Sequence, residues 1–106
     1  MTEQSRVVHD ADERVFQLVT EDDEVAGYAE YVPTDGALAI MHVVVRPQFG
    51  GRGYGTRLAE AALDEAREQG VGVLPYCSFV LDHVRRNPET IDLVPEEARA
   101  RFGLAA

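Results

Sequence analysis

The chain has 106 residues, 45% of them hydrophobic and 27% charged, a composition typical of an ordinary globular domain. Nineteen acidic against ten basic residues give a formal net charge of −9, which opposes binding to nucleic acid and favours cationic ligands such as amines. The single cysteine, Cys77, excludes an internal disulfide, and with three scattered histidines it gives no metal-site spacing. We therefore predict one domain over residues 1–106 that holds no metal.

The sequence contains no candidate membrane segment. No apolar run approaches the length of about 18 residues that a membrane-spanning helix needs. Residues 1–15 lack the apolar segment of a signal peptide. We therefore expect a cytoplasmic protein without a membrane partner.

The first half of the chain predicts antiparallel strands. Residues 14–20 alternate apolar and polar side chains, as a half-buried strand does, and residues 6–10 form an earlier strand or a lead-in to it. A second strand over residues 25–32 leads through an Asp-Gly turn at residues 33–36 to a third strand over residues 37–45. The end of this third strand is apolar on both faces, so we expect protein or ligand to cover both.

The second half of the chain predicts helices. Residues 54–70 repeat apolar side chains at four-residue spacing, and Gly70 stands where a C-terminal cap belongs. A short strand over residues 71–75, a helix over 78–87 and a short helix over 94–103 follow. We therefore predict an α+β domain whose mostly antiparallel sheet is covered by two or three helices. The side chains expected to point inward from the helix at 78–87 are Phe79, Val80, His83 and Val84.

A glycine-rich turn separates the third strand from the first helix. Such a turn directs unpaired backbone N–H groups to one point at the positive end of the helix dipole, as phosphate sites do. An ordinary flexible turn needs only one or two glycines, so the excess favours a phosphate site. Arg46, Arg52 and Arg57 add positive charge within it. The glycines are Gly50, Gly51, Gly53 and Gly55.

The spacing of these glycines excludes two nucleotide-binding motifs. The dinucleotide pattern G-x-G-x-x-G fails because Thr56 stands at its third glycine, and a Walker A loop fails because Thr56 and Arg57 replace its lysine and hydroxyl residues. The pattern that fits is Q-x-x-G-x-G, at Gln48, Gly51 and Gly53. It resembles the pyrophosphate-binding loop of the GNAT superfamily of acetyl-CoA-dependent N-acetyltransferases.

Residues 25–94 are also similar to the minimal, single-domain branch of that superfamily. In this branch the strand before the loop carries a histidine, here His42, the next strand ends in Pro-x-Cys, here residues 75–77, and Ser-Phe-Val opens the following helix. The resemblance implies a minimal GNAT (acyl-CoA N-acyltransferase) fold and an enzyme that moves an acetyl group from acetyl-CoA to an amine. The acceptor would be a small, polyamine-like molecule, a protein lysine or an N-terminus. The coenzyme A contacts that it implies are Val43, Val45, Gln48, Gly50, Gly51, Arg52, Gly53, Tyr54, Gly55 and Thr56.

Three side chains are candidates for the transfer step. Cys77 would be a nucleophile, a proton donor or a wall of the pocket, and otherwise a buried structural thiol. His42, on a strand face with Leu38, Ile40 and Val44, is either a hydrogen-bonded core residue or, as the resemblance implies, a wall of the active site or a base. Tyr76 would donate a proton to the leaving thiolate or only pack against the core.

Two departures from the minimal branch weaken catalysis more than acyl-CoA binding. Val44 stands where the branch has a glutamate in the general-base position, and residues 87–90 read Asn-Pro-Glu-Thr instead of His-Pro-Glu-Tyr. The alternative to an enzyme is therefore a module that holds CoA or acyl-CoA without turnover. A third hypothesis is an interaction domain whose glycine loop binds another anion.

Overall fold

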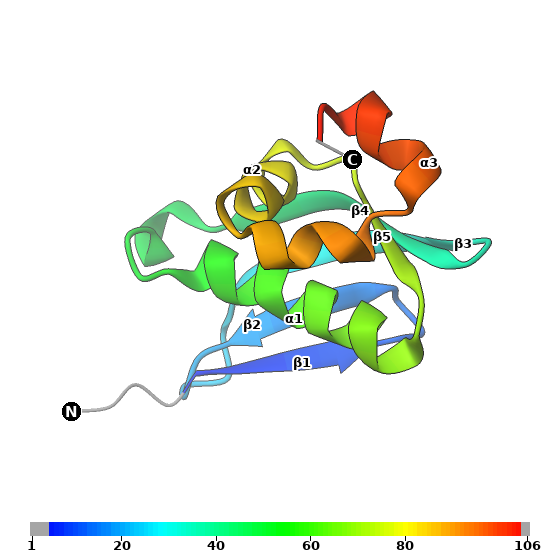
Figure 1. The fold of residues 1–106 in the computed structure, drawn as a ribbon. Helices are drawn as coiled ribbons and strands as arrows, with labels where there is room; N and C mark the ends of the chain where they lie inside the picture. Colours follow the sequence, from blue (N-terminus) through cyan, green and yellow to red (C-terminus); the bar gives the residue numbers. More distant parts are fainter. Residues whose placement is uncertain (1–4, 105–106) are drawn as a thin grey trace.

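The structure of the protein is a computed structural model that describes residues 5–104, and Figure 1 shows its arrangement of helices on a curved sheet. Its strands are β1 (Arg6–Asp10), β2 (Val15–Val19), β3 (Val25–Thr34), β4 (Ala37–Val45) and β5 (Gly72–Pro75). Its helices are α1 (Tyr54–Gln69), α2 (Ser78–Arg86) and the short α3 (Glu96–Arg99). The 3₁₀ turns are η1 (Pro47–Phe49), η2 (Pro88–Leu93) and η3 (Ala100–Phe102).

The sheet has the strand order β1-β2-β3-β4-β5. The strands from β1 to β4 pair antiparallel with their sequence neighbours, while β5 pairs parallel to β4 after the crossover through α1. This confirms the predicted α+β fold with a mostly antiparallel sheet. Residues 6–10 form a true edge strand, and the helix predicted over 94–103 divides into α3 and η3.

Helix α1 lies at the centre of the core because one of its faces carries apolar side chains, most of them small. Leu58, Ala62 and Ala66 are fully buried, as their four-residue spacing predicted. Alanines bring the helix axis close to the sheet, and the burial of Leu58 alone contributes about 2 kcal/mol. Gly70, in the left-handed conformation at φ 73°, ends the helix by donating its N–H to the carbonyls of Ala66 and Arg67.

A β-bulge interrupts β4. Glu30 of β3 pairs with His42 and Tyr31 pairs with Ile40, so Met41 is an extra residue without a partner in β3. A bulge of this kind bends its strand and reverses the alternation of side chains beyond it. The bulge thus changes which residues of β4 face the helices.

His42 consequently lies on the opposite face of the sheet from Leu38 and Ile40. Leu38 and Ile40 belong to the core before the bulge, and Val43 and Val45 pack against it afterwards. His42 is exposed on the other face. The prediction that His42 shares a face with Leu38 and Ile40 was wrong, because strict alternation across a strand holds only where no residue is inserted.

Strands β4 and β5 separate beyond the bulge. Their parallel pairing ends at Ile40 and Pro75, and the N–H of Cys77 then donates to the carbonyl of Ile40 at 3.0 Å. The rest of β4, as far as Val45, pairs only with β3 within the described residues. Pro75 has no N–H to continue the pairing, so the far edge of β4 is left open beside the start of α2.

In the part of the chain that the structure describes, no helix is both long and apolar enough to cross a membrane.

Candidate active site

The glycine loop is shaped by two residues in the left-handed conformation. Gly51 has φ 78° and Gly53 has φ 76°, values that side chains other than glycine adopt only with strain. Gly53 is the N-cap of α1 and has no side chain that accepts from the first turn of the helix. Since the first backbone N–H groups of a helix have no partner inside it, those of α1 are directed outward at the loop.

A cleft of about 250 Å³ lies over this helix start. Among residues 5–104 no carboxylate lines it, and most of the predicted coenzyme A contacts come together there. Val43, Gln48 and Arg52 are outside its lining, and Gln48 is exposed on η1. The lining residues are Val45, Phe49, Gly50, Gly51, Gly53, Tyr54, Gly55, Thr56 and Phe79.

Two aromatic side chains of this cleft were not predicted as site residues. Phe79 was expected to point inward, but it is 38% exposed, and its ring lies so close to Gly55 that a Cβ there would be 2.9 Å from the Phe79 Cζ atom. This contact explains the glycine at position 55. Phe49 follows Gln48 of the motif directly, so its position in sequence was a usable signal, whereas Phe79 required the tertiary structure.

Tyr54 contributes its backbone and not its side chain. Its ring is only 2% exposed, and its hydroxyl has no hydrogen-bond partner among the described residues. A buried hydroxyl without a partner costs about 1 to 3 kcal/mol. The ring packs 6.4 Å from that of Phe49, between centroids, which fixes the wall of the cleft.

Of the three arginines of the loop, two lie by the ring of Phe49 and one is directed elsewhere. The Arg57 guanidinium donates to the hydroxyl of Ser5 and, at 3.2 Å, to its carbonyl, so it is directed towards the start of β1 and not into the turn as predicted. The guanidinium carbons of Arg46 and Arg52 lie 5.8 and 5.5 Å from the centroid of the Phe49 ring. Positive charge is therefore concentrated at the Phe49 side of the loop.

The catalytic candidates lie around the gap between β4 and β5. Cys77 is half-buried at the N-cap of α2. Tyr76 is exposed, and its ring meets that of Phe102 edge-on at 5.2 Å. Among residues 5–104 no hydrogen bond joins the side chains of Cys77, Tyr76 and His42. The structure thus brings Cys77 and Tyr76 to the point where the strands part, with His42 on the other face.

His42 lines a separate cleft on that face. The cleft has a volume of about 300 Å³, and the carboxylates of Glu13 and Glu30 stand at its wall. Val44, on the same face, is 39% exposed, so within residues 5–104 protein covers only one face of the end of β4. Arg14 also lines this cleft, so its charged side chains are two carboxylates and one guanidinium beside the imidazole of His42.

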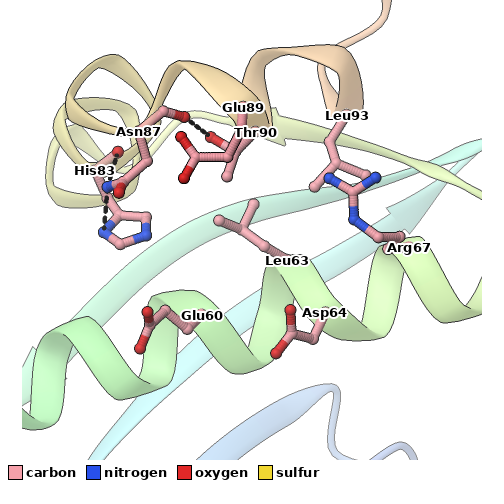
Figure 2. A pocket seen from close by; sticks show the side chains of 9 residues that line it. All are labelled: Glu60, Leu63, Asp64, Arg67, His83, Asn87, Glu89, Thr90 and Leu93. Carbon is pink, nitrogen blue, oxygen red and sulfur yellow. Dashed lines mark hydrogen bonds between the residues drawn. The ribbon is translucent and has the colours of Figure 1, made fainter.

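A third cleft, of about 280 Å³, lies between α1 and the segment from α2 to η2 (Figure 2). Carboxylates of Glu60, Asp64 and Glu89 line it. Arg67, also in its lining, is paired through both terminal nitrogens with Asp92 at 3.1 and 3.2 Å, and this hydrogen bond lowers the pKa of the Asp92 carboxyl. Three carboxylates make this cleft unsuitable for a polyphosphate.

Histidine 83 is buried at the wall of the same cleft, as the helical pattern predicted. Asn87 donates its side-chain N–H to the carbonyl of His83 at 2.8 Å (Figure 2).

Within the described range, 5–104, no group of three or more histidine, cysteine or acidic side chains is arranged to hold a metal ion.

Comparison with known proteins gives the family. The family model described as GCN5-related N-acetyl-transferase matches residues 15–93. Streptothricin acetyltransferase from Streptomyces lavendulae is 40% identical over 67 residues, which cover 61% of this chain and 35% of that protein. The chain thus spans about a third of the length of this curated relative.

Solved structures agree with the fold. The NMR structure of a GCN5-like protein from Staphylococcus aureus superposes with a TM-score of 0.66 at 22% identity, covering 85% of this chain and 87% of that one. A GNAT family N-acetyltransferase from Escherichia coli, solved in complex with CoA, gives a TM-score of 0.52 at 21% identity, covering 56% and 37% of the two chains. The family match extends from β2 through α1 and the glycine loop to the end of η2, and the chain belongs to the GCN5-related N-acetyltransferase family.

Proposed function

We propose that this protein transfers an acetyl group from acetyl-CoA to an amine, with the backbone of residues 50–56 holding the pyrophosphate of the coenzyme. The observation that carries the proposal is the cleft over the start of α1, whose lining in the described part of the chain holds no carboxylate, in a chain of this family. Left-handed Gly51 and Gly53 leave no Cβ between a ligand and the outward N–H groups of the helix. The residues present therefore fit a diphosphate.

The open edge of β4 suits the pantetheine arm. Beyond Ile40 the backbone groups on that edge have no strand partner in the described residues, and the arm carries amides that donate and accept in the same way. Val43 and Val45 pack towards the core there and supply an apolar surface along the arm. This arrangement would bring the thioester to the gap where Cys77 and Tyr76 lie.

The amine would approach from the other face of the sheet. The cleft that holds His42 is lined by two carboxylates, from Glu13 and Glu30, against one guanidinium, from Arg14. The chain as a whole is acidic as well, which favours a cationic acceptor. The name of the curated relative, streptothricin acetyltransferase, suggests a small molecule in preference to a protein. Donor and acceptor would then meet at the bulge from opposite faces.

The chemistry requires a neutral amine and a proton for the departing thiolate. The amine nitrogen attacks the thioester carbonyl, the carbon–sulfur bond breaks, and the proton lost by the nitrogen ends on the sulfur. Val44 accepts no proton, so His42, directly or through water, is the proposed base for the amine. Tyr76 or Cys77 is the proposed donor to the sulfur, since both lie at the gap.

The test is release of free thiol from acetyl-CoA in the presence of a panel of di- and polyamines. Turnover that depends on both the amine and the protein supports the proposal. We expect His42→Ala to lower kcat by about 10²-fold or more, with its largest effect below the pKa of the amine. Cys77→Ala separates a nucleophile from a pocket wall, because only loss of a nucleophile removes activity altogether. Absence of acetyl-CoA binding would contradict the proposal.

A second candidate function is storage or sensing of acyl-CoA without turnover. Val44 favours it, because valine replaces the general-base glutamate that the minimal branch carries. The two candidates differ in one result. If acetyl-CoA binds tightly and no amine in the panel produces thiol, the binding module replaces the enzyme.

A further inference from the structure

We propose that the acetyl acceptor is a diamino acid, a small amine that also carries a carboxylate, and that Arg14 binds this carboxylate. The inference rests on the proposed function, since it names the class of acceptor for the cleft that holds His42. In the transfer, the amine nitrogen bonds to the acetyl carbon, the carbon–sulfur bond breaks and the proton of the nitrogen ends on the sulfur. The carboxylate of the acceptor is bound and stays unchanged.

The charged side chains that line this cleft have both signs. Glu13 and Glu30 contribute carboxylates, and Arg14 contributes a guanidinium. In the part of the chain that the structure describes, none of these three side chains takes part in a hydrogen bond or an ion pair, so they do not neutralise one another directly. A diamino acid at neutral pH carries two ammonium groups and one carboxylate. Its charges therefore match those of the lining with the signs reversed.

The backbone of Arg14 is held in place directly before β2. Its N–H donates to the carbonyl of Ala11 at 3.3 Å, and its carbonyl accepts from the N–H of Tyr31 at 3.1 Å. Its φ of 56° lies in the left-handed region, which a residue other than glycine adopts only with strain. The N–H of Glu13 donates to the Asp10 side chain at 3.1 Å in the same turn. This turn thus fixes Glu13 and Arg14 as neighbours at the wall of the cleft.

An arginine in this cleft favours an amino acid over a plain diamine. The planar guanidinium matches a carboxylate through two parallel hydrogen bonds. Toward a ligand with ammonium groups alone, the same charge is repulsive and offsets part of the attraction of Glu13 and Glu30. The cleft of about 300 Å³ also contains His42, so the carboxylate contact and the proposed base face one small ligand.

The test compares amino acids with diamines that lack only the carboxylate. The pairs are lysine with cadaverine and ornithine with putrescine, and release of free thiol from acetyl-CoA gives kcat/KM for each. Charge-assisted hydrogen bonds to the carboxylate predict that the wild-type protein uses each amino acid about tenfold or more efficiently than its diamine. Lysinamide keeps the size of lysine without its negative charge and should behave as cadaverine does. This comparison needs no variant.

Two matched variants assign the preference to one side chain. Arg14→Gln should bring the ratio of each pair to near one, through a higher KM for the amino acid, with kcat/KM for the diamine unchanged or slightly raised. Arg86→Gln removes the same charge from α2, where Arg86 pairs with Asp82 at 3.0 Å, and should leave the ratio at its wild-type value. Thermal unfolding of each variant confirms that the fold is retained.

Equal or better use of the diamines by the wild-type protein would overturn the inference and leave the proposed function intact. Release of thiol with neither class of amine would contradict the proposed transfer itself. A preference for amino acids that survives Arg14→Gln would overturn the assignment of the carboxylate contact to Arg14.

Discussion

Two clefts lie along helix α1, and they differ in charge and not in size. The cleft over the helix start has about 250 Å³, and the one between α1 and η2 has about 280 Å³. Counting only the residues that the structure describes, the first has no carboxylate in its lining, and the second has three, from Glu60, Asp64 and Glu89. In a chain of net charge −9, a surface without acidic groups at the positive end of a helix dipole is the feature that sets a phosphate site apart.

The largest expected difference comes from matched substitutions at the two ends of α1. Gly53 and Gly70 both cap the helix at φ near 75°, and both have open space where a Cβ would stand. Gly53→Glu and Gly70→Glu should each lower the free energy of unfolding by about 1 to 2 kcal/mol. Only Gly53→Glu should abolish acetyl-CoA binding, by more than about 100-fold, because it places a carboxylate among the N–H groups. Calorimetry and thermal unfolding measure the two effects, and equal loss of affinity in both variants would contradict the assignment.

A smaller effect is expected where Phe79 closes over the helix start. Gly55→Ala brings a Cβ to 2.9 Å from the Phe79 ring, which must then move towards the cleft. We expect a loss of stability of about 1 kcal/mol and a several-fold loss of CoA affinity. Adding Phe79→Ala should remove the clash and recover most of the affinity. If Gly55→Ala binds CoA as the wild type does, Phe79 is not part of the cleft that the ligand uses.

A polar cluster away from the two clefts of α1 should affect stability and leave CoA affinity unchanged, although Tyr31 also lines the cleft that holds His42. The Tyr31 hydroxyl is hydrogen-bonded to Nε2 of His9 at 2.6 Å. Burial, with a further contribution from Glu65, raises the pKa of Tyr31 above its ordinary value. The pKa of Tyr31 is therefore higher in the folded than in the unfolded protein. The contribution of the protonated hydroxyl to the free energy of unfolding is complete below the unfolded pKa of about 10, and it is lost as pH rises through the folded pKa.

Tyr31→Phe therefore has a pH-dependent signature. It should cost about 1 kcal/mol at pH 7 and flatten the fall in stability above pH 10, with CoA affinity unchanged. Urea unfolding at pH 7 and pH 10.5 measures both. A variant with the same alkaline profile as the wild type would show that Tyr31 is not the titrating group.

The smallest effect is expected in the acidic cleft. Glu60→Gln with Glu89→Gln removes two of its three exposed carboxylates, and surface changes of this kind alter stability by less than about 0.5 kcal/mol. CoA affinity should rise by less than about twofold, through the loss of weak, screened repulsion. A large loss of affinity would mean that the ligand occupies this cleft and would reverse the comparison.

The sequence predicted the parts of this structure that depend on local pattern. The strand and helix positions, the apolar face of α1 and the cap at Gly70 follow from periodicity and from glycine, so they were confirmed. The bulge at Met41 was not predicted, because it depends on pairing with β3, and it moved His42 to the other face. The exposure of Phe79 likewise depends on a contact with Gly55, from a distant part of the chain.

The candidate site also contains features that the sequence predicted and features that depend on tertiary contacts. The glycines of the loop were identified from spacing, and all four of them line one cleft. The direction of a long side chain is set by tertiary partners, so the sequence did not separate Arg57, bound to Ser5, from Arg46, whose guanidinium carbon lies 5.8 Å from the centroid of the Phe49 ring. The roles of Cys77, His42 and Tyr76 remain predictions.

The most direct test of the central claim is a ¹H–¹⁵N correlation spectrum of the protein titrated with acetyl-CoA. The account predicts that the largest shifts fall on the amides of residues 50–56 and on the open part of β4, with those of η2 and the middle of α1 nearly unchanged. Shifts confined to the acidic cleft, or no shifts at millimolar acetyl-CoA, would contradict it.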